Sequence, residues 1–180
     1  MPPSIATRTG DDGTTQLLFG QRVPKDHPQV ETVGAFDELN AALGAIKPHL
    51  ATTPRDQAIL TLITRVQTNL VALMGELACA ESDAGRYLAS KFEKLGPSDV
   101  QQLDAALAEL EARGLTFSGW ATPGGNARAA ALDVARTTAR RAERHLSIIT
   151  RHGRNVRPEV HQFTNRLSDL LWLLSREAEQ

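Results

Sequence analysis

Apolar residues recur every three or four positions along most of the chain, the spacing that gathers them on one side of an α-helix. Five stretches show this period, and each begins or ends near a proline, a glycine or a capping residue. Ser98 with Gln101 predicts a capping box at the start of the third helix. The expected helices cover approximately residues 30–46, 54–80, 96–113, 126–153 and 158 to nearly the C-terminus.

The fourth stretch has the most regular packing pattern. Its apolar positions are three, four, three, four and three residues apart, as in long helices that pack nearly antiparallel in a bundle. Aromatic residues make up only 4% of the chain, and alanine and leucine dominate the apolar positions, which favours helix packing over sheets. The sequence therefore predicts an all-α fold, a five-helix bundle. The positions in question are Leu132, Ala135, Ala139, Ala142, Leu146 and Ile149.

The beginning of the chain has a different character. It lacks a helical period and is rich in Gly, Asp, Thr and Pro, so turn chemistry dominates there. We expect one domain over residues 1–180, with an irregular N-terminal arm (1–29) on the helical bundle (30–180).

Composition narrows the classes of function. The hydrophobic fraction of 41% and the charged fraction of 23% are those of an ordinary soluble protein. A net charge of -1 gives no case for attraction to nucleic acid or to a membrane surface. No apolar run approaches the ~20 residues that span a bilayer, and the first residues lack a secretory pattern. The expected location is the cytoplasm, and the single cysteine, Cys79, excludes an intramolecular disulfide.

The fourth helix carries a stripe of charge beside its apolar positions. Arg136, Arg140 and Glu143 fall within this stripe, whereas Arg141 points well away from it. Guanidinium groups remain charged and offer a rigid fork of donors that suits phosphate oxygens. The alternative is that Arg140 and Glu143 form only a surface pair, worth ~0.3–0.5 kcal/mol.

The arm contains the segment TGDDGTT, Thr9 to Thr15. Its glycines permit backbone conformations that point successive N–H groups at an anion. Its threonine hydroxyls can donate hydrogen bonds to phosphate oxygens. Lys25 adds a positive charge further along the arm. The segment is not a Walker A loop, since no GK[ST] follows. A plain cluster of β-turns and a solvated lysine are the alternatives.

Two further features need a partner or a structural explanation. Asn165, Asp169 and Trp172 share one face of the last helix, which indicates either a ligand or a hydrogen-bonded asparagine in the bundle interior. Trp120 lies in a Gly- and Pro-containing loop, residues 117–126, where it either contacts a ligand or folds back on the core.

Taken together, these motifs resemble a known family. The segments TRTGD-x-GTT, RVPKD, DELN, PGG, ARTxxRRAER and NRLSDLLWLLSR, in this order, resemble the trimeric PduO-type ATP:cob(I)alamin adenosyltransferases. The resemblance implies a five-helix bundle, a homotrimer with active sites between subunits, and transfer of the 5′-deoxyadenosyl group of ATP to cob(I)alamin with release of triphosphate. ATP, Mg²⁺ and cobalamin are the implied ligands. A corrinoid reductase or an adenosylcobalamin-dependent mutase is a candidate partner.

The resemblance also implies roles for single residues. Lys25 matches a phosphate-binding lysine, Arg140 the arginine at the polyphosphate, Glu143 the carboxylate associated with magnesium, and Asn165 an asparagine that contacts ATP. The residues that match the ATP-cradling arm are Thr9, Gly10, Asp11, Gly13, Thr14 and Thr15.

At the corrinoid, Asp37 and Arg136 match an ion pair across the subunit interface. Trp120 takes the place of a phenylalanine that packs under the corrin ring and displaces its lower ligand. This chain departs from the family pattern in having WATPGG for the commoner FILPGG, and Asp133 where a histidine is common.

Three other readings remain open. An ATP-binding bundle could act on another acceptor, the chain could be a helical interaction module, or residues 136–144 could bind nucleic acid. The near-zero net charge and the lack of aromatics among these arginines argue against nucleic acid. A ferritin-like metal bundle would need Glu-x-x-His motifs, which the sequence lacks.

Overall fold

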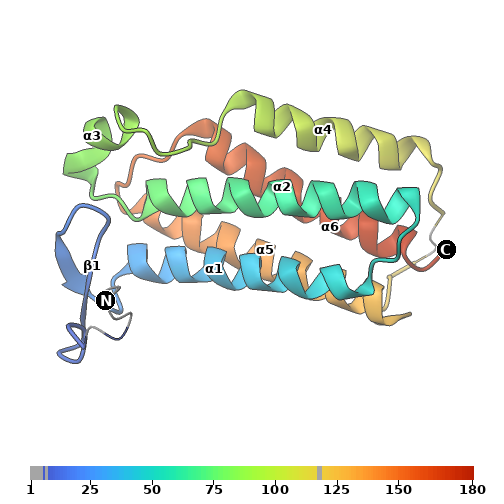
Figure 1. Cartoon of the computed structure of the whole chain (residues 1–180), viewed down its shortest axis with the longest axis horizontal. Helices are drawn as coiled ribbons and strands as arrows, with labels where there is room; N and C mark the ends of the chain where they lie inside the picture. The colour runs from blue at the N-terminus through green and yellow to red at the C-terminus, as the bar shows by residue number, and fades with distance from the viewer. Residues whose placement is uncertain (1–5, 7, 117–118) are drawn as a thin grey trace.

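The computed structural model describes residues 6, 8–116 and 119–180, and within them five long helices lie side by side (Figure 1). The predicted all-α bundle is therefore confirmed. The helix boundaries agree with the periodicity to within a few residues, because proline and capping residues set most of the starts. The long helices are α1 (Pro28–Ile46), α2 (Pro54–Leu77), α4 (Pro97–Ala112), α5 (Ala127–Arg151) and α6 (Pro158–Glu177).

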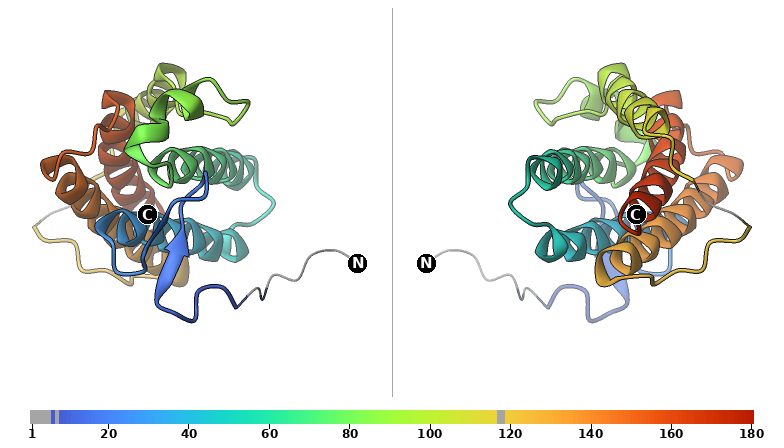
Figure 2. Two further views of the ribbon diagram at one scale, coloured as in Figure 1. Left: turned by 90° about the vertical axis from the view of Figure 1, so that its left-hand side faces the viewer. Right: turned by 90° about the vertical axis from the view of Figure 1, so that its right-hand side faces the viewer.

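The arrangement of the helices follows from their side chains. Helix α5 packs against α1 on one side and α6 on the other, while α6 also packs against α4 and α1 against α2 (Figure 2). The alanines of α5, Ala135, Ala139 and Ala142, are completely buried. Small side chains at these positions let the neighbouring helices approach closely, and this fixes the edge of α5 that carries the charged stripe.

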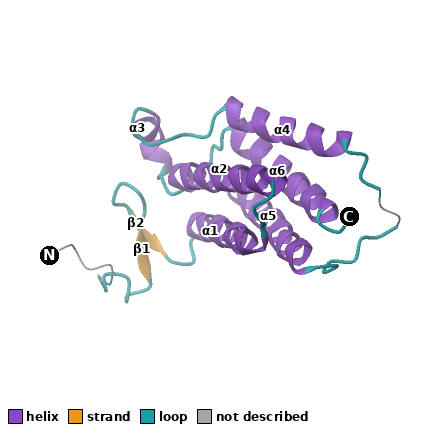
Figure 3. Ribbon diagram, turned by 45° about the vertical axis from the view of Figure 1, so that its right-hand side comes forward, coloured by secondary structure: helices purple, strands orange, loops and turns teal. Residues whose placement is uncertain are grey.

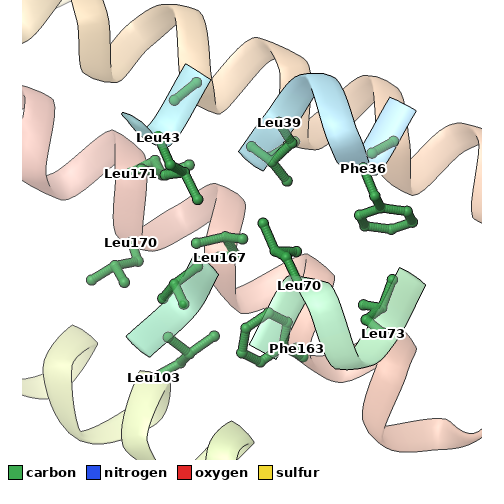
Figure 4. Packing of buried hydrophobic residues seen from close by; sticks show 14 of the residues in the cluster. Phe36, Leu39, Leu43, Leu70, Leu73, Leu103, Phe163, Leu167, Leu170 and Leu171 are labelled. Carbon is green, nitrogen blue, oxygen red and sulfur yellow. The ribbon is translucent and has the colours of Figure 1, made fainter. Parts of the chain in front are cut away.

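The core draws leucine, isoleucine, valine, alanine and phenylalanine side chains from all five long helices, and Figure 4 shows part of it. Phe36 and Leu39 of α1 meet Leu70 of α2 and Phe163 of α6, and each of the four is 0% exposed. Burial of each such side chain contributes about 1.5–3 kcal/mol relative to leaving it in water. This rigid core holds α5 and α6 in a fixed relation.

The cap of α4 differs from the prediction. The carboxylate of Asp99 accepts a hydrogen bond from the Gly96 backbone N–H at 2.9 Å, so Gly96 is the N-cap and Asp99 the third helical residue. The capping box of Ser98 and Gln101 is therefore wrong by two positions. Asp99 is favoured because its buried carboxylate also pairs with Arg65 of α2 at 2.8 Å.

The arm contains regular structure that the sequence did not predict. Strands β1 (Thr14–Gln16) and β2 (Arg22–Pro24) form an antiparallel pair (Figure 3). The turn between them fixes the hairpin to the bundle, because Leu17 is buried and the Leu18 N–H donates to the Ala78 carbonyl at 2.9 Å. The strands escaped prediction because three residues are too few to show an alternating pattern.

The connection 81–96, between the second and third expected helices, also holds two short helices, η2 (Glu81–Asp83) and α3 (Ala84–Leu88). A third short helix, η1 (Lys47–His49), follows α1. Tyr87 anchors α3, since its buried hydroxyl donates to the Ala72 carbonyl at 3.0 Å. Burial raises the pKa of Tyr87 to about 12, so it remains a neutral donor.

Helix α2 contradicts the expectation that no stretch of the chain is long and apolar enough to span a bilayer. Of the described helices, α2 is long and apolar enough to cross a bilayer by length and composition alone. It packs as a core helix instead, with Ile63, Val66 and Leu73 buried against the rest of the bundle. Length and hydropathy do not distinguish these two cases.

Candidate functional site

The edge of α5 next to its buried apolar positions carries the predicted charged residues. All six apolar positions are at most 4% exposed, which leaves Arg140 exposed and Glu143 half-buried at the border of the packed face. Within the described residues, the Arg140 guanidinium forms neither an ion pair nor a hydrogen bond. An arginine in this state is available to an external anion.

Glu143 and Asn165 come together from different helices. The Asn165 side-chain amide of α6 donates to the Glu143 carboxylate of α5 at 3.4 Å. The alternative of an Arg140–Glu143 surface pair is therefore wrong for this chain, because Glu143 faces α6. Asn165 is exposed, which also excludes the alternative of an asparagine in the bundle interior.

The surroundings of Glu143 fit a metal ion that arrives with a ligand. Its carboxylate has one long hydrogen bond and retains free lone pairs. Among the described residues, no group of three or more His, Cys, Asp or Glu side chains could hold a metal by itself. Mg²⁺ commonly binds through one or two carboxylates together with substrate phosphates, so a single carboxylate here matches that donor set.

The hairpin of the arm brings Lys25 to the TGDDGTT segment. Thr14 pairs with Pro24, which places the Lys25 backbone N–H 2.9 Å from the Gly13 carbonyl. The Lys25 ammonium lies over Gly10, where an added Cβ would come within 3.2 Å of Nζ. Gly10 therefore leaves room for the lysine, and the predicted association of Lys25 with this segment exists within one chain.

Two residues that the sequence analysis overlooked hold the segment in shape. Arg22 donates to the Thr9 carbonyl at 2.8 Å, to the Asp12 carboxylate at 3.2 Å and to the Thr14 hydroxyl. Asp12 accepts from the Thr14 hydroxyl at 2.8 Å and from its backbone N–H at 2.9 Å. These hydrogen bonds from Thr14, together with the Arg22 charge, lower the pKa of Asp12. From the sequence alone, nothing indicates which carboxylate of the adjacent Asp11 and Asp12 forms these hydrogen bonds.

Three other predicted arm residues lie in or next to the hairpin. Asp11 is exposed, Thr15 is half-buried opposite Val23, and Gly13 has φ +79°. Seen from its end in Figure 2, the bundle has the arm leaving beside α1, on the side away from α5. Among the described residues, no hydrogen bond or ion pair joins Lys25 to Arg140 or Glu143.

The predicted partners Asp37 and Arg136 also remain apart within the chain. Asp37 is exposed on α1. Arg136 donates through Nε to the buried carboxylate of Asp133 at 3.0 Å. Its two terminal nitrogens make no hydrogen bond within the described residues, so they are free to meet a carboxylate from another subunit.

Trp120 is fully exposed, at 100% of its surface. The alternative that it folds back on the core is therefore wrong. Phe117 and Ser118 of the same loop lie outside the described residues. The loop borders a shallow hollow of about 310 Å³, lined by Pro123, Gly124 and Val134 among others, and Val134 is 59% exposed. An exposed tryptophan beside an exposed apolar hollow is typical of a surface that another molecule covers.

A larger hollow than the one beside the Trp120 loop lies elsewhere on the bundle. It is a groove of about 640 Å³ between α2 and α4, bordered by Arg55, Arg65 and Glu109. None of the predicted site residues lines it. The size of a hollow therefore does not locate the predicted residues in this chain.

Comparison with known proteins gives the family. Residues 5–178 match the family model described as cobalamin adenosyltransferase. The chain belongs to this family. It is 40% identical to the corrinoid adenosyltransferase PduO of Salmonella typhimurium over 96% of the chain, and it spans about half, 49%, of that relative. A corrinoid adenosyltransferase of Citrobacter freundii is 36% identical, with 97% of the chain and 94% of the relative covered.

Solved structures agree with this assignment. A variant of a PduO-type ATP:corrinoid adenosyltransferase from Lactobacillus reuteri, complexed with cobalamin and ATP, matches with a TM-score of 0.84. Sequence identity is 29%, over 98% of this chain and 91% of that chain. This member of the family therefore shares its helical bundle with a protein that binds cobalamin and ATP in its solved structure.

Proposed function

We propose that this protein transfers the 5′-deoxyadenosyl group of ATP to cob(I)alamin, forming adenosylcobalamin and releasing triphosphate. The observation that carries the proposal is the exposed edge of α5, where unpaired Arg140 lies beside the Glu143–Asn165 contact. It supports binding of a polyphosphate, and family membership supplies the acceptor.

The reaction needs no covalent bond between the protein and either substrate. Cob(I)alamin is a strong nucleophile, so its cobalt forms a bond to C5′ while the C5′–O bond breaks and its electron pair stays on the triphosphate. The hard chemistry belongs to the corrinoid. The protein must align C5′ with cobalt and stabilise the negative charge of the leaving group, which is a matter of positioning and preorganised positive charge.

Each half of the site has a part in this reaction. On α5 and α6, Arg140 binds the triphosphate and Asn165 contacts the nucleotide. From the arm, Lys25 and the backbone N–H groups around Gly13 enclose the phosphates, in the shape that Arg22 and Asp12 maintain. Mg²⁺ held by Glu143 would neutralise part of the phosphate charge.

A homotrimer brings the two halves together. Because the arm runs away from α5 in its own chain, a complete site takes the arm of one subunit and the α5 edge of another. Asp37 and Arg136 then pair across the interface, and Trp120 packs beneath the corrin ring. A cytoplasmic location, with a reductase or a mutase as neighbour, fits this chemistry.

The test is an anaerobic assay with reduced cobalamin, ATP and magnesium. We expect the visible spectrum to change to that of adenosylcobalamin, with one triphosphate released per cobalt alkylated. ATP analogues whose C5′–O bond is replaced by a non-cleavable link serve as the control.

The rival enzyme reading predicts a different outcome. If ATP binds but no adenosylcobalamin forms under full reduction, the chain acts on another acceptor. If ATP does not bind at saturating concentrations, the α5 edge is not a nucleotide site and the proposal is wrong.

A further inference from the structure

Four charged side chains form a continuous chain from α5 to the loop that carries Trp120. Arg136 donates to one carboxylate oxygen of Asp133 at 3.0 Å, and Arg176 of α6 donates to the other. Arg176 also donates to Glu179 at 2.7 Å, and Glu179 accepts the backbone N–H of Gly125 at 3.3 Å.

The middle of this chain is buried. The side chains of Asp133 and Arg176 are 6% and 5% exposed. A buried carboxylate is stable only when its oxygens are paired, and each oxygen of Asp133 has its own arginine. The guanidinium of Arg176 is a rigid fork, so it fixes the positions of Asp133 and Glu179 relative to one another.

The far end of the chain holds the loop by close contact. A Cβ added to Gly125 would lie 2.7 Å from the Glu179 carboxylate oxygen, so only glycine allows this approach. Next to it, the Asn126 side chain donates to the Ala178 carbonyl at 2.6 Å, and Gln180 donates to the Thr116 carbonyl at 3.1 Å. The three residues that follow α6 therefore contact both ends of the loop.

We infer that Asp133, Arg176 and Glu179 are positioning residues that hold Arg136 and the Trp120 loop in a fixed relation at the corrinoid side of the site. The inference rests on the proposed function for the roles of Arg136 and Trp120. The inference predicts an effect on the corrinoid side alone, because the proposed ATP-binding groups Arg140, Glu143 and Lys25 lie outside this chain of contacts. Loss of a positioning residue weakens corrinoid binding and leaves ATP binding unchanged.

The first experiment does not depend on the activity. Amide hydrogen exchange is compared for wild type, Glu179→Ala, Glu179→Gln and Gly125→Ala. We expect faster exchange at residues 119–126 in Glu179→Ala and Gly125→Ala. Glu179→Gln should give an intermediate rate, because its single amide oxygen can accept from Gly125 or from Arg176 but not from both. Glu111→Ala removes an exposed carboxylate of α4 and is the matched control. Unchanged loop exchange in Glu179→Ala would overturn the inference, even if the protein proved to have another activity.

The second experiment measures the KM for cob(I)alamin and for ATP separately. Glu179→Ala should raise the corrinoid KM by about tenfold, as expected for misplacement of a binding loop, with the ATP KM unchanged. Asp133→Asn should do the same, and the double variant should add little, because both changes break one network. Equal effects on both KM values, or fully additive effects, would show a general structural role and contradict the inference.

Discussion

Arg140 differs from most described arginines of the chain in having no carboxylate partner. Arg141, its neighbour, pairs with Glu38 of α1, and Arg157 pairs with Glu76 at 2.6 Å. Arg140 is exposed beside a packed face, so its charge is open to an anion from solution. At the scale of single residues this makes Arg140 the strongest indication of an anion site.

Arg140→Ala should lower turnover by about 10²–10³-fold, the usual effect of removing a charged donor from a developing anion. Its free energy of unfolding should stay within about 0.5 kcal/mol of wild type, because an exposed side chain without partners is removed. The measurements are the anaerobic assay and urea unfolding. Arg141→Ala is the matched control and should retain activity; if both variants behave alike, Arg140 has no special role.

Trp120→Ala should affect one stage of the reaction. An aromatic side chain under the corrin ring displaces the lower ligand, and loss of that donor makes cob(II)alamin easier to reduce. We expect a large loss of rate from cob(II)alamin and a smaller loss from prereduced cob(I)alamin. The electron paramagnetic resonance spectrum of bound cob(II)alamin reports the lower ligand directly. Equal rates for the variant and wild type from cob(II)alamin would remove Trp120 from the mechanism.

At the scale of elements, the arm depends on a few residues for its conformation. Gly13 has φ +79° and open space around its missing Cβ, so a side chain there meets no clash and only backbone strain. Gly13→Ala should cost about 1 kcal/mol locally and raise the KM for ATP, with little change in the unfolding of the bundle.

Amide exchange of residues 8–25 and ATP titration check the Gly13→Ala prediction. Gly85→Ala in α3, where the added Cβ also meets open space, is the control and should leave both unchanged. Normal ATP affinity in Gly13→Ala would mean that the arm conformation described here is not the one that binds the nucleotide.

Asp56 connects three elements at the other end of the bundle. Its carboxylate accepts from Ala51 N–H at 3.0 Å and from Arg128 of α5 at 2.6 Å. Burial alone would raise the pKa of Asp56, but these hydrogen bonds and the Arg128 charge together lower it below its ordinary value of 3.8. The ionised form therefore stabilises the fold.

The pH dependence follows from the sign of this shift. A lowered carboxyl pKa gives stability that is complete above about pH 4 and is lost as the pH falls through the lower folded value. The free energy of unfolding of wild type should exceed that of Asp56→Asn at pH 6, and the difference should shrink by pH 2–3. Urea unfolding at both pH values measures it. A constant difference would show that ionisation of Asp56 does not contribute.

The extent of sequence prediction also differs among elements. Helices α1, α2, α5 and α6 were predictable because their apolar positions keep one period over many turns and their starts carry Pro or a capping residue. The hairpin β1–β2 and helix α3 were not, since three to five residues carry no measurable period. Among site residues, the motifs indicated Arg140 and Glu143, whereas Arg22 and Asp12 act through a hydrogen-bond pattern that exists only after the arm has folded.

At the scale of the whole molecule, the ribbon of the arm leaves the bundle beside α1, and among the described residues no hydrogen bond or ion pair joins Lys25 to Arg140 or Glu143. Assembly is therefore part of the catalytic account, and a particle of about three times the 19.5 kDa chain is expected in solution. Light scattering on the purified protein measures this mass. A monomer with full activity would require the arm to reach its own α5, against the arrangement in Figure 2.

Two inactive variants, Lys25→Ala and Arg140→Ala, can be co-expressed so that their chains assemble into mixed trimers. If each site takes its arm from one subunit and its α5 edge from another, about one quarter of the sites in random trimers regain both intact halves. The anaerobic assay should then show about that fraction of wild-type adenosylcobalamin formation. Activity no higher than that of either variant alone would contradict the account.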